Sequence, residues 1–119
     1  MILVVDDDPA LSRMLALTLR NDGFDVVAAP DGAAALETLR VREPDLIVLD
    51  LEMPVMDGRQ FYRELRREGR HIPVLVVSAY EARRGQRELG ADGYLDKPFS
   101  PDELVERVRT LASAARDGA

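Results

Sequence analysis

The chain has 119 residues and a formal net charge of −6 at pH 7, and this length predicts a single domain over residues 1–119. Hydrophobic residues make up 46% and charged residues 32%, which predicts a packed core, and the lack of cysteine excludes disulfides and thiolate metal sites. The acidic charge argues against direct nucleic-acid contact, and the lack of a long apolar stretch or leader pattern predicts a cytoplasmic protein without membrane contact.

Five apolar segments recur along the chain, separated by helical patterns. Most of them are continuous and do not alternate with polar residues, which indicates strands that are covered on both faces, as in a parallel sheet. The predicted strands are Ile2–Val5, Phe24–Ala29, Leu46–Leu49, Val74–Val77 and the short Tyr94–Leu95.

Each predicted strand is followed by a helix, and most of these helices have a clear start signal. The fourth, Glu81–Leu89, is the weakest, because it is short and polar and contains Gly85. We expect residues 113–119 to form a frayed tail or a truncated linker. The predicted start signals are Asp8-Pro9, Asp31-Gly32, Asp57-Gly58 and the capping box Ser100-Pro101-Asp102-Glu103.

Strands that alternate with helices at this spacing predict an α/β fold. The sheet should be five-stranded, parallel and doubly wound, with helices on both faces and right-handed crossovers. In such sheets ligands bind beyond the carboxyl ends of the strands. We therefore looked for chemistry in the residues that follow each strand.

Four of the five strand ends carry polar groups. Asp6 and Asp7 follow the first strand, Asp50 follows the third, Ser78 follows the fourth, and Lys97, the only lysine, follows the last. Because the strands are parallel, these residues should meet at one edge of the sheet.

Three carboxylates gathered in one crevice repel each other unless a cation lies among them. With only oxygen ligands, Mg²⁺ (or Mn²⁺) is the expected ion. Asp6, Asp7 and Asp50 carry three negative charges, which Mg²⁺ and Lys97 would balance. A neutral site of this kind can accept a phosphoryl group, and a carboxylate can be the nucleophile that forms an acyl phosphate.

Four motifs in register resemble the receiver domain of two-component response regulators. They are Asp6-Asp7, the segment Asp50-Leu51-Glu52-Met53-Pro54-Val55-Met56-Asp57-Gly58, Ser78-Ala79 and Lys97-Pro98-Phe99. The resemblance implies a flavodoxin-like sheet with strand order 2-1-3-4-5. It also implies that the protein is a phosphorylation switch and not an enzyme beyond self-phosphorylation from small phosphodonors and self-dephosphorylation.

The resemblance assigns roles to individual residues of the site. Asp50 would be the phosphoacceptor, and Asp7 would bind the metal directly. Asp6 would bind the metal through water, and Glu52 would offer its backbone carbonyl.

Three further roles concern the response to phosphorylation. Ser78 would hydrogen-bond the phosphoryl group and Lys97 would pair with it. Tyr94 would be the aromatic switch residue that turns inward when Ser78 moves. A cis peptide bond is implied at Lys97-Pro98. Glu52 and Tyr80 occupy positions that tune hydrolysis in the family.

The implied partners are a sensor histidine kinase or phosphotransfer protein, an output domain or downstream protein, and a second copy in a phosphorylation-dependent homodimer.

In the first helix, Ala10, Met14 and Leu17 form an apolar flank beyond the core stripe. This flank is either part of a wide buried face or a docking strip for a kinase helix hairpin. The fourth helix region is about one turn shorter than is usual in the family, which places the usual dimer mode in doubt.

Simpler interpretations remain open at this stage. The acids after the first strand could be helix caps, Asp50 could be a turn residue, and Tyr94 could serve packing alone. Two other functions also remain open. One is a metal-dependent hydrolase with an aspartyl nucleophile, and the other is a degenerate receiver that only binds partners.

Overall fold

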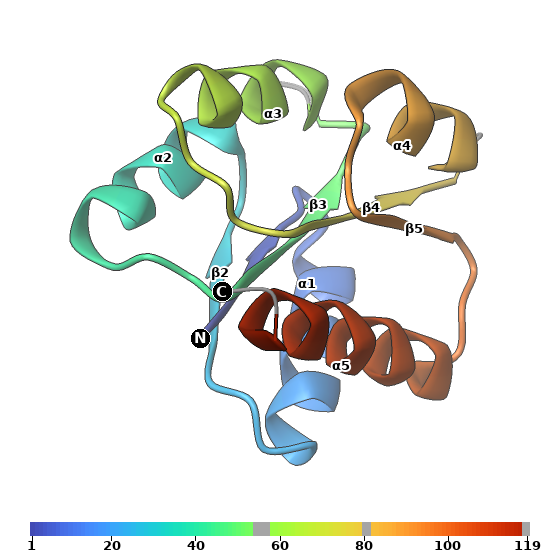
Figure 1. The fold of residues 1–119 in the computed structure, drawn as a ribbon. Helices are drawn as coiled ribbons and strands as arrows, with labels where there is room; N and C mark the ends of the chain where they lie inside the picture. Colours follow the sequence, from blue (N-terminus) through green and yellow to red (C-terminus); the bar gives the residue numbers. More distant parts are fainter. Residues whose placement is uncertain (54–57, 80–81, 118–119) are drawn as a thin grey trace.

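The structure, a computed structural model, describes residues 1–53, 58–79 and 82–117, with side chains up to residue 113 in the last helix. Within these residues five parallel strands form one sheet in the order β2-β1-β3-β4-β5, which confirms the predicted fold and strand order (Figure 1). The strands are β1 (Ile2–Val5), β2 (Val26–Ala29), β3 (Leu46–Asp50), β4 (Val74–Ser78) and β5 (Gly93–Asp96).

Helices cover both faces of the sheet. Helices α2, α3 and α4 lie on one face, and α1 and α5 lie on the other (Figure 1). In the described part of the chain the helices are α1 (Pro9–Asn21), α2 (Gly32–Val41), α3 (Gly58–Arg67), α4 (Ala82–Leu89) and α5 (Pro101–Asp117).

The central strands divide their side chains between two apolar layers. Successive residues of a strand point to opposite faces, so Leu3 packs toward α2 and α3, whereas Ile2 and Val4 pack toward α1 and α5. Strands β1, β3 and β4 are buried along their whole length, as the continuous apolar runs predicted. This double burial fixes where the ends of the central strands lie in the sheet.

The predicted helix starts are confirmed where the structure describes them. The Asp8 side chain accepts a hydrogen bond from the amide of Ala10 at 3.0 Å. Ser100 and Glu103 form the reciprocal bonds of a capping box, at 3.2 and 3.3 Å. The Asp31 carboxylate accepts from an amide of α2 at 2.8 Å. The predicted start signal at Asp57 lies outside the described residues.

Several elements differ in length from the sequence-based expectation: β2 begins at Val26 instead of Phe24, and β3 and β4 each extend one residue further. Helix α5 extends to Asp117, into residues 113–119, and the expectation that these residues form a frayed tail or a truncated linker stays a prediction. Strand β5 has four residues instead of two, because Gly93 and Asp96 pair with Leu75 and Ser78 of β4. An edge strand that is only partly buried carries a weak apolar signal, and this explains its underestimated length.

Glycine allows α3 and α4 to approach the end of β3 closely. A Cβ atom at Gly58 would lie 2.5 Å from the carbonyl oxygen of Asp50 and 2.7 Å from the Cα atom of Leu51. A Cβ atom at Gly85 would lie 2.4 Å from a methyl group of Leu51. Both helices therefore rest directly on the residues that carry the candidate site.

Replacing Gly58 with alanine should destabilise the fold, although alanine is the better helix former. The added methyl group would meet backbone atoms, which cannot rotate away. We expect a loss of about 1–3 kcal/mol in unfolding free energy, measured by thermal or urea denaturation. The control Ser113→Ala, at an exposed position of α5, should change stability by less than about 0.5 kcal/mol. Equal stability of Gly58→Ala and the wild type would contradict this packing argument.

Candidate functional site

The carboxyl ends of four strands meet at one edge of the sheet. Asp6 follows β1, Asp50 ends β3, Ser78 ends β4, and Lys97 follows β5. These strands are neighbours in the sheet, and Asp50 is paired with Val77 of β4. The backbone amide of Lys97 donates a hydrogen bond to the carbonyl of Ser78 at 2.9 Å. The structure thus places all four at one edge, as expected from the parallel topology.

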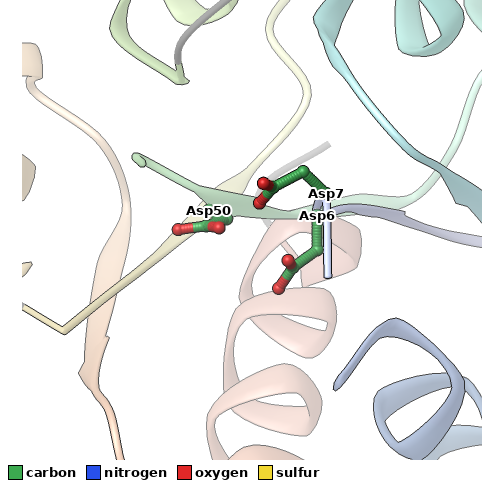
Figure 2. A group of neighbouring side chains, drawn as sticks. All are labelled: Asp6, Asp7 and Asp50. Atoms are coloured by element: carbon green, nitrogen blue, oxygen red, sulfur yellow. The ribbon is translucent and has the colours of Figure 1, made fainter. Parts of the chain in front are cut away.

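Three carboxylates lie together at the centre of this edge. One side-chain oxygen from each of Asp6, Asp7 and Asp50 lies within 4.8 Å of the others (Figure 2). Asp6 and Asp50 are each 3% exposed, whereas Asp7 is open to solvent. The cluster is therefore acidic and mostly buried, with one side accessible.

Backbone amides hold the two buried carboxylates in place. The amide of Asp8 donates to Asp6 at 2.9 Å, and the amide of Glu52 donates to Asp50 at 3.1 Å. In each case the donor is two residues further along the chain. Each strand therefore continues into a turn whose backbone fixes its own acid.

The Lys97 ammonium group is the positive charge of the cluster. Its Nζ atom lies 3.5 Å from Asp50 and 3.9 Å from Asp6. The peptide bond between Lys97 and Pro98 is cis, as the resemblance implied. A compact ammonium group on a flexible stem can face both carboxylates from this position.

Burial changes the ionisation of the two buried acids. It raises the pKa of the Asp50 carboxyl to about 7, against the opposing effects of the Glu52 amide and Lys97. Burial likewise raises the pKa of Asp6. One lysine does not offset this loss of hydration, so further positive charge would be favourable here.

The donor set suits a small, hard divalent cation. Carboxylate oxygens are the ligands that Mg²⁺ prefers, and oxygens on one Mg²⁺ ion lie roughly 3–4 Å apart. One oxygen of each of the three acids lies within 4.8 Å of the others, and small side-chain rotations would bring these oxygens to that spacing. Asp6, Asp7 and Asp50 therefore fit such an ion.

The Ser78 hydroxyl is held by a residue whose side chain the sequence analysis did not use. Ser78 is 1% exposed, and its Oγ atom donates to the Glu52 carboxylate at 2.6 Å. From the sequence, Glu52 is expected to offer its backbone carbonyl to the metal and to occupy a position that tunes hydrolysis, and both roles stay predictions; its contact with Ser78 was not expected. The available signal was a second acid two residues after Asp50.

Tyr94 lies apart from the acidic cluster. It is half-buried on β5, and its ring lies against the guanidinium group of Arg107 of α5, 5.5 Å from the ring centre. Arg107 also donates to the carbonyl of Tyr94. The role of Tyr94 as a switch residue stays a prediction. The other residue assigned a tuning role, Tyr80, lies outside the described residues.

An apolar groove opens beside the Lys97 side chain. It has a volume of about 410 Å³ and is formed by α1 and the segment after β5. Met14 and Leu17 are 36% and 59% exposed, so the interpretation of this flank as a wide buried face is wrong. The residues that line the groove are Leu11, Met14, Ala79, Lys97, Pro98 and Phe99.

The protein is a doubly wound α/β protein with three acids, a hydroxyl and a lysine at the carboxyl edge of its sheet. Sequence comparison identifies its family. The family described as response regulator receiver domain matches residues 2–109. The chain therefore belongs to the receiver domain family of two-component response regulators, which are signalling proteins and not classical enzymes.

Several characterised proteins are similar to the chain over most of its length. The DNA-binding response regulator MtrA of Mycolicibacterium smegmatis is 46% identical over 112 residues, covering 91% of this chain and 48% of MtrA. The regulatory protein SphR of Synechococcus elongatus is 43% identical over 122 residues, covering 92% of this chain and 48% of SphR. The chain thus spans about half the length of these relatives.

Solved structures show the same fold. The receiver domain of the Francisella response regulator 1452 superposes with a TM-score of 0.88 at 35% identity, covering 95% of this chain and 96% of that one. The response regulator TrrA of Thermotoga maritima, solved in complex with Mg²⁺-BeF, superposes with a TM-score of 0.83 at 34% identity, covering 92% and 96%.

The raised pKa of Asp50 predicts a pH-dependent stability in the presence of a chelator. The folded state favours the protonated form of Asp50. The contribution of this carboxyl group to the free energy of unfolding is therefore fully present below about pH 4 and is lost as the pH rises through about 7. The advantage in unfolding free energy of Asp50→Asn over the wild type should therefore be larger at pH 8 than at pH 4.5, by about 1–3 kcal/mol.

Urea denaturation at both pH values measures this difference. Saturating Mg²⁺ at pH 8 should stabilise the wild type more than the variant, because the variant has lost one carboxylate. A stability difference that is independent of pH would show that Asp50 is not strained by burial.

Proposed function

We propose that this chain is a phosphorylation switch in which Asp50 accepts a phosphoryl group from a phosphohistidine of a sensor histidine kinase or phosphotransfer protein. The observation that carries this proposal is the buried Asp50 carboxylate between two other acids and Lys97. The protein would be located in the cytoplasm. A chain without cysteine has no disulfide bond that the reducing conditions there could break.

The transfer itself needs little from the protein beyond position and charge. An oxygen of ionised Asp50 attacks phosphorus, and the bond from phosphorus to the donor nitrogen breaks with its electron pair passing to the imidazole. The product is an acyl phosphate. Lys97, 3.5 Å from Asp50, pairs with an oxygen of the transferred group.

Asp6, Asp7 and Asp50 would hold Mg²⁺ (or Mn²⁺), with the backbone carbonyl of Glu52 as a further ligand. The ion would supply the positive charge that lets an anionic phosphoryl group approach an anionic site. The Mg²⁺-BeF complex of the Thermotoga maritima protein supports this part of the proposal.

Phosphorylation would change the partner surface through Ser78 and Tyr94. It adds about −1.5 to −2 charges and three strong acceptor oxygens. The Ser78 hydroxyl moves to the phosphoryl group, and Tyr94 of the neighbouring strand turns into the vacated space. Arg107, which contacts Tyr94 now, links this movement to α5.

The apolar groove beside Lys97 would receive the kinase helix hairpin. Met14 is exposed at its rim, and Lys97 lines it, so a helix seated there lies beside the phosphoacceptor. An output domain of the same protein, or a separate downstream protein, would read the changed surface, and a phosphorylation-dependent homodimer is a third partner. The half-length coverage of MtrA and SphR supports an output domain.

Incubation with Mg²⁺ and acetyl phosphate should add one phosphoryl group to Asp50. Intact-protein and peptide mass spectrometry would locate it. Asp50→Asn should abolish labelling and Lys97→Arg should slow it about tenfold or more, since a planar fork does not reproduce the ammonium position. The matched control Asp25→Asn, at the opposite end of the strands, should be labelled like the wild type.

The same incubation separates the alternatives. Turnover of phosphate esters would indicate a metal-dependent hydrolase. Absence of both labelling and turnover would indicate a domain that only binds partners.

Met14→Glu should slow phosphotransfer from the partner kinase about tenfold or more, because a charge would enter an apolar contact. It should leave labelling by acetyl phosphate unchanged. The partner is found by phosphotransfer profiling against the histidine kinases of the source organism. The control Val41→Glu places the same change on an exposed position of α2 and should affect neither reaction. Equal losses with kinase and acetyl phosphate would reject the docking role.

A further inference from the structure

We propose that Glu52 is a positioning residue that holds the Ser78 hydroxyl in the unphosphorylated domain and competes with the phosphoryl group for it. This inference rests on the proposed function, because it identifies the Glu52 carboxylate as the hydrogen-bond acceptor that the phosphoryl group must replace at Ser78. It concerns the Glu52 side chain, which the proposed metal site does not use.

The geometry joins two neighbouring strand ends. The Glu52 amide donates to Asp50 at 3.1 Å, and the Glu52 carboxylate accepts from Ser78 at 2.6 Å. The same residue thus contacts the phosphoacceptor with its backbone and the switch hydroxyl with its side chain. Glu52 therefore links the phosphoacceptor to the Ser78 hydroxyl on the neighbouring strand.

The stoichiometry of the hydroxyl makes the two contacts exclusive. A serine hydroxyl has one hydrogen and can donate it to one acceptor at a time. In the present state that hydrogen is directed to Glu52. To donate to a phosphoryl oxygen, Ser78 must first release the carboxylate, whatever other contacts it keeps.

Burial and charge determine the strength and direction of this competition. Ser78 is 1% exposed, so water does not readily replace the carboxylate as acceptor. Hydrogen bonds to charged acceptors are among the stronger ones and shift an equilibrium about tenfold or more. Glu52 is itself exposed and can turn into solvent, which also removes its negative charge from the incoming group.

Glu52 therefore weakens the response to phosphoryl groups by a defined amount. Without the Glu52 carboxylate, the Ser78 hydroxyl no longer has to break this hydrogen bond before it donates to the phosphoryl group. The active arrangement then requires less binding energy. The Glu52 carboxylate thus favours the arrangement of Ser78 in the unphosphorylated domain.

Beryllium fluoride with Mg²⁺ serves as the phosphoryl probe, and its binding constant is measured by titration. Glu52→Ala should bind the probe about tenfold more tightly than the wild type. Glu52→Gln should fall between the two, because the amide oxygen still accepts a hydrogen bond but without charge. The matched control Glu106→Gln, an exposed position of α5, should bind like the wild type.

A double-mutant cycle separates the hydrogen bond from simple charge repulsion. Removal of the Glu52 carboxylate should have a larger effect in the wild type than in a Ser78→Ala background, by about tenfold. Equal effects in both backgrounds would overturn the proposal, because they would show that Glu52 acts by repulsion alone.

A second readout needs neither metal nor phosphoryl probe. In the wild type, NMR should detect a slowly exchanging Ser78 hydroxyl proton, and Glu52→Ala should shift that signal and speed the exchange of the proton. An unchanged chemical shift and exchange rate in Glu52→Ala would overturn the proposal. If the wild type neither binds beryllium fluoride nor takes label from acetyl phosphate, the proposed function fails. If it does both and Glu52→Ala behaves identically, this inference alone fails.

Discussion

Two carboxylates, those of Asp6 and Asp50, are buried within reach of the single ammonium group of Lys97. Burial of like charges is unfavourable, and it raises the pKa of both acids. The arrangement persists because the strands that carry the acids are packed on both faces and cannot separate. A protein that keeps such a site carries an unfavourable excess of buried negative charge, which a divalent cation would offset.

The local backbone turns this imbalance into a defined geometry. The amides of Asp8 and Glu52 orient the two buried acids, so neither carboxylate can rotate away from its neighbour without losing a hydrogen bond. Gly58 lets α3 begin directly against the carbonyl of Asp50. The result is a site whose groups are positioned before any ligand arrives, which lowers the reorganisation that a transfer reaction requires.

The same packing gives the site routes to the surface. Leu51, next to Asp50, fills the space that Gly85 leaves in α4. Tyr94 on β5 meets Arg107 of α5. A rearrangement at Asp50 or Ser78 would therefore reach α4 through Leu51 and α5 through Tyr94 and Arg107. In the described helices, none is long and apolar enough to cross a membrane.

The sequence by itself determined the fold and the identity of the clustered residues. Continuous apolar strands imply a parallel sheet, and a parallel sheet brings Asp6, Asp50 and Lys97 to one edge, whereas the strand order was implied by the resemblance to receiver domains. Side-chain direction and exposure depend on contacts between distant segments. Only the tertiary structure decided that Glu52 reaches across to Ser78 on the next strand, and that the Met14 flank is open to solvent.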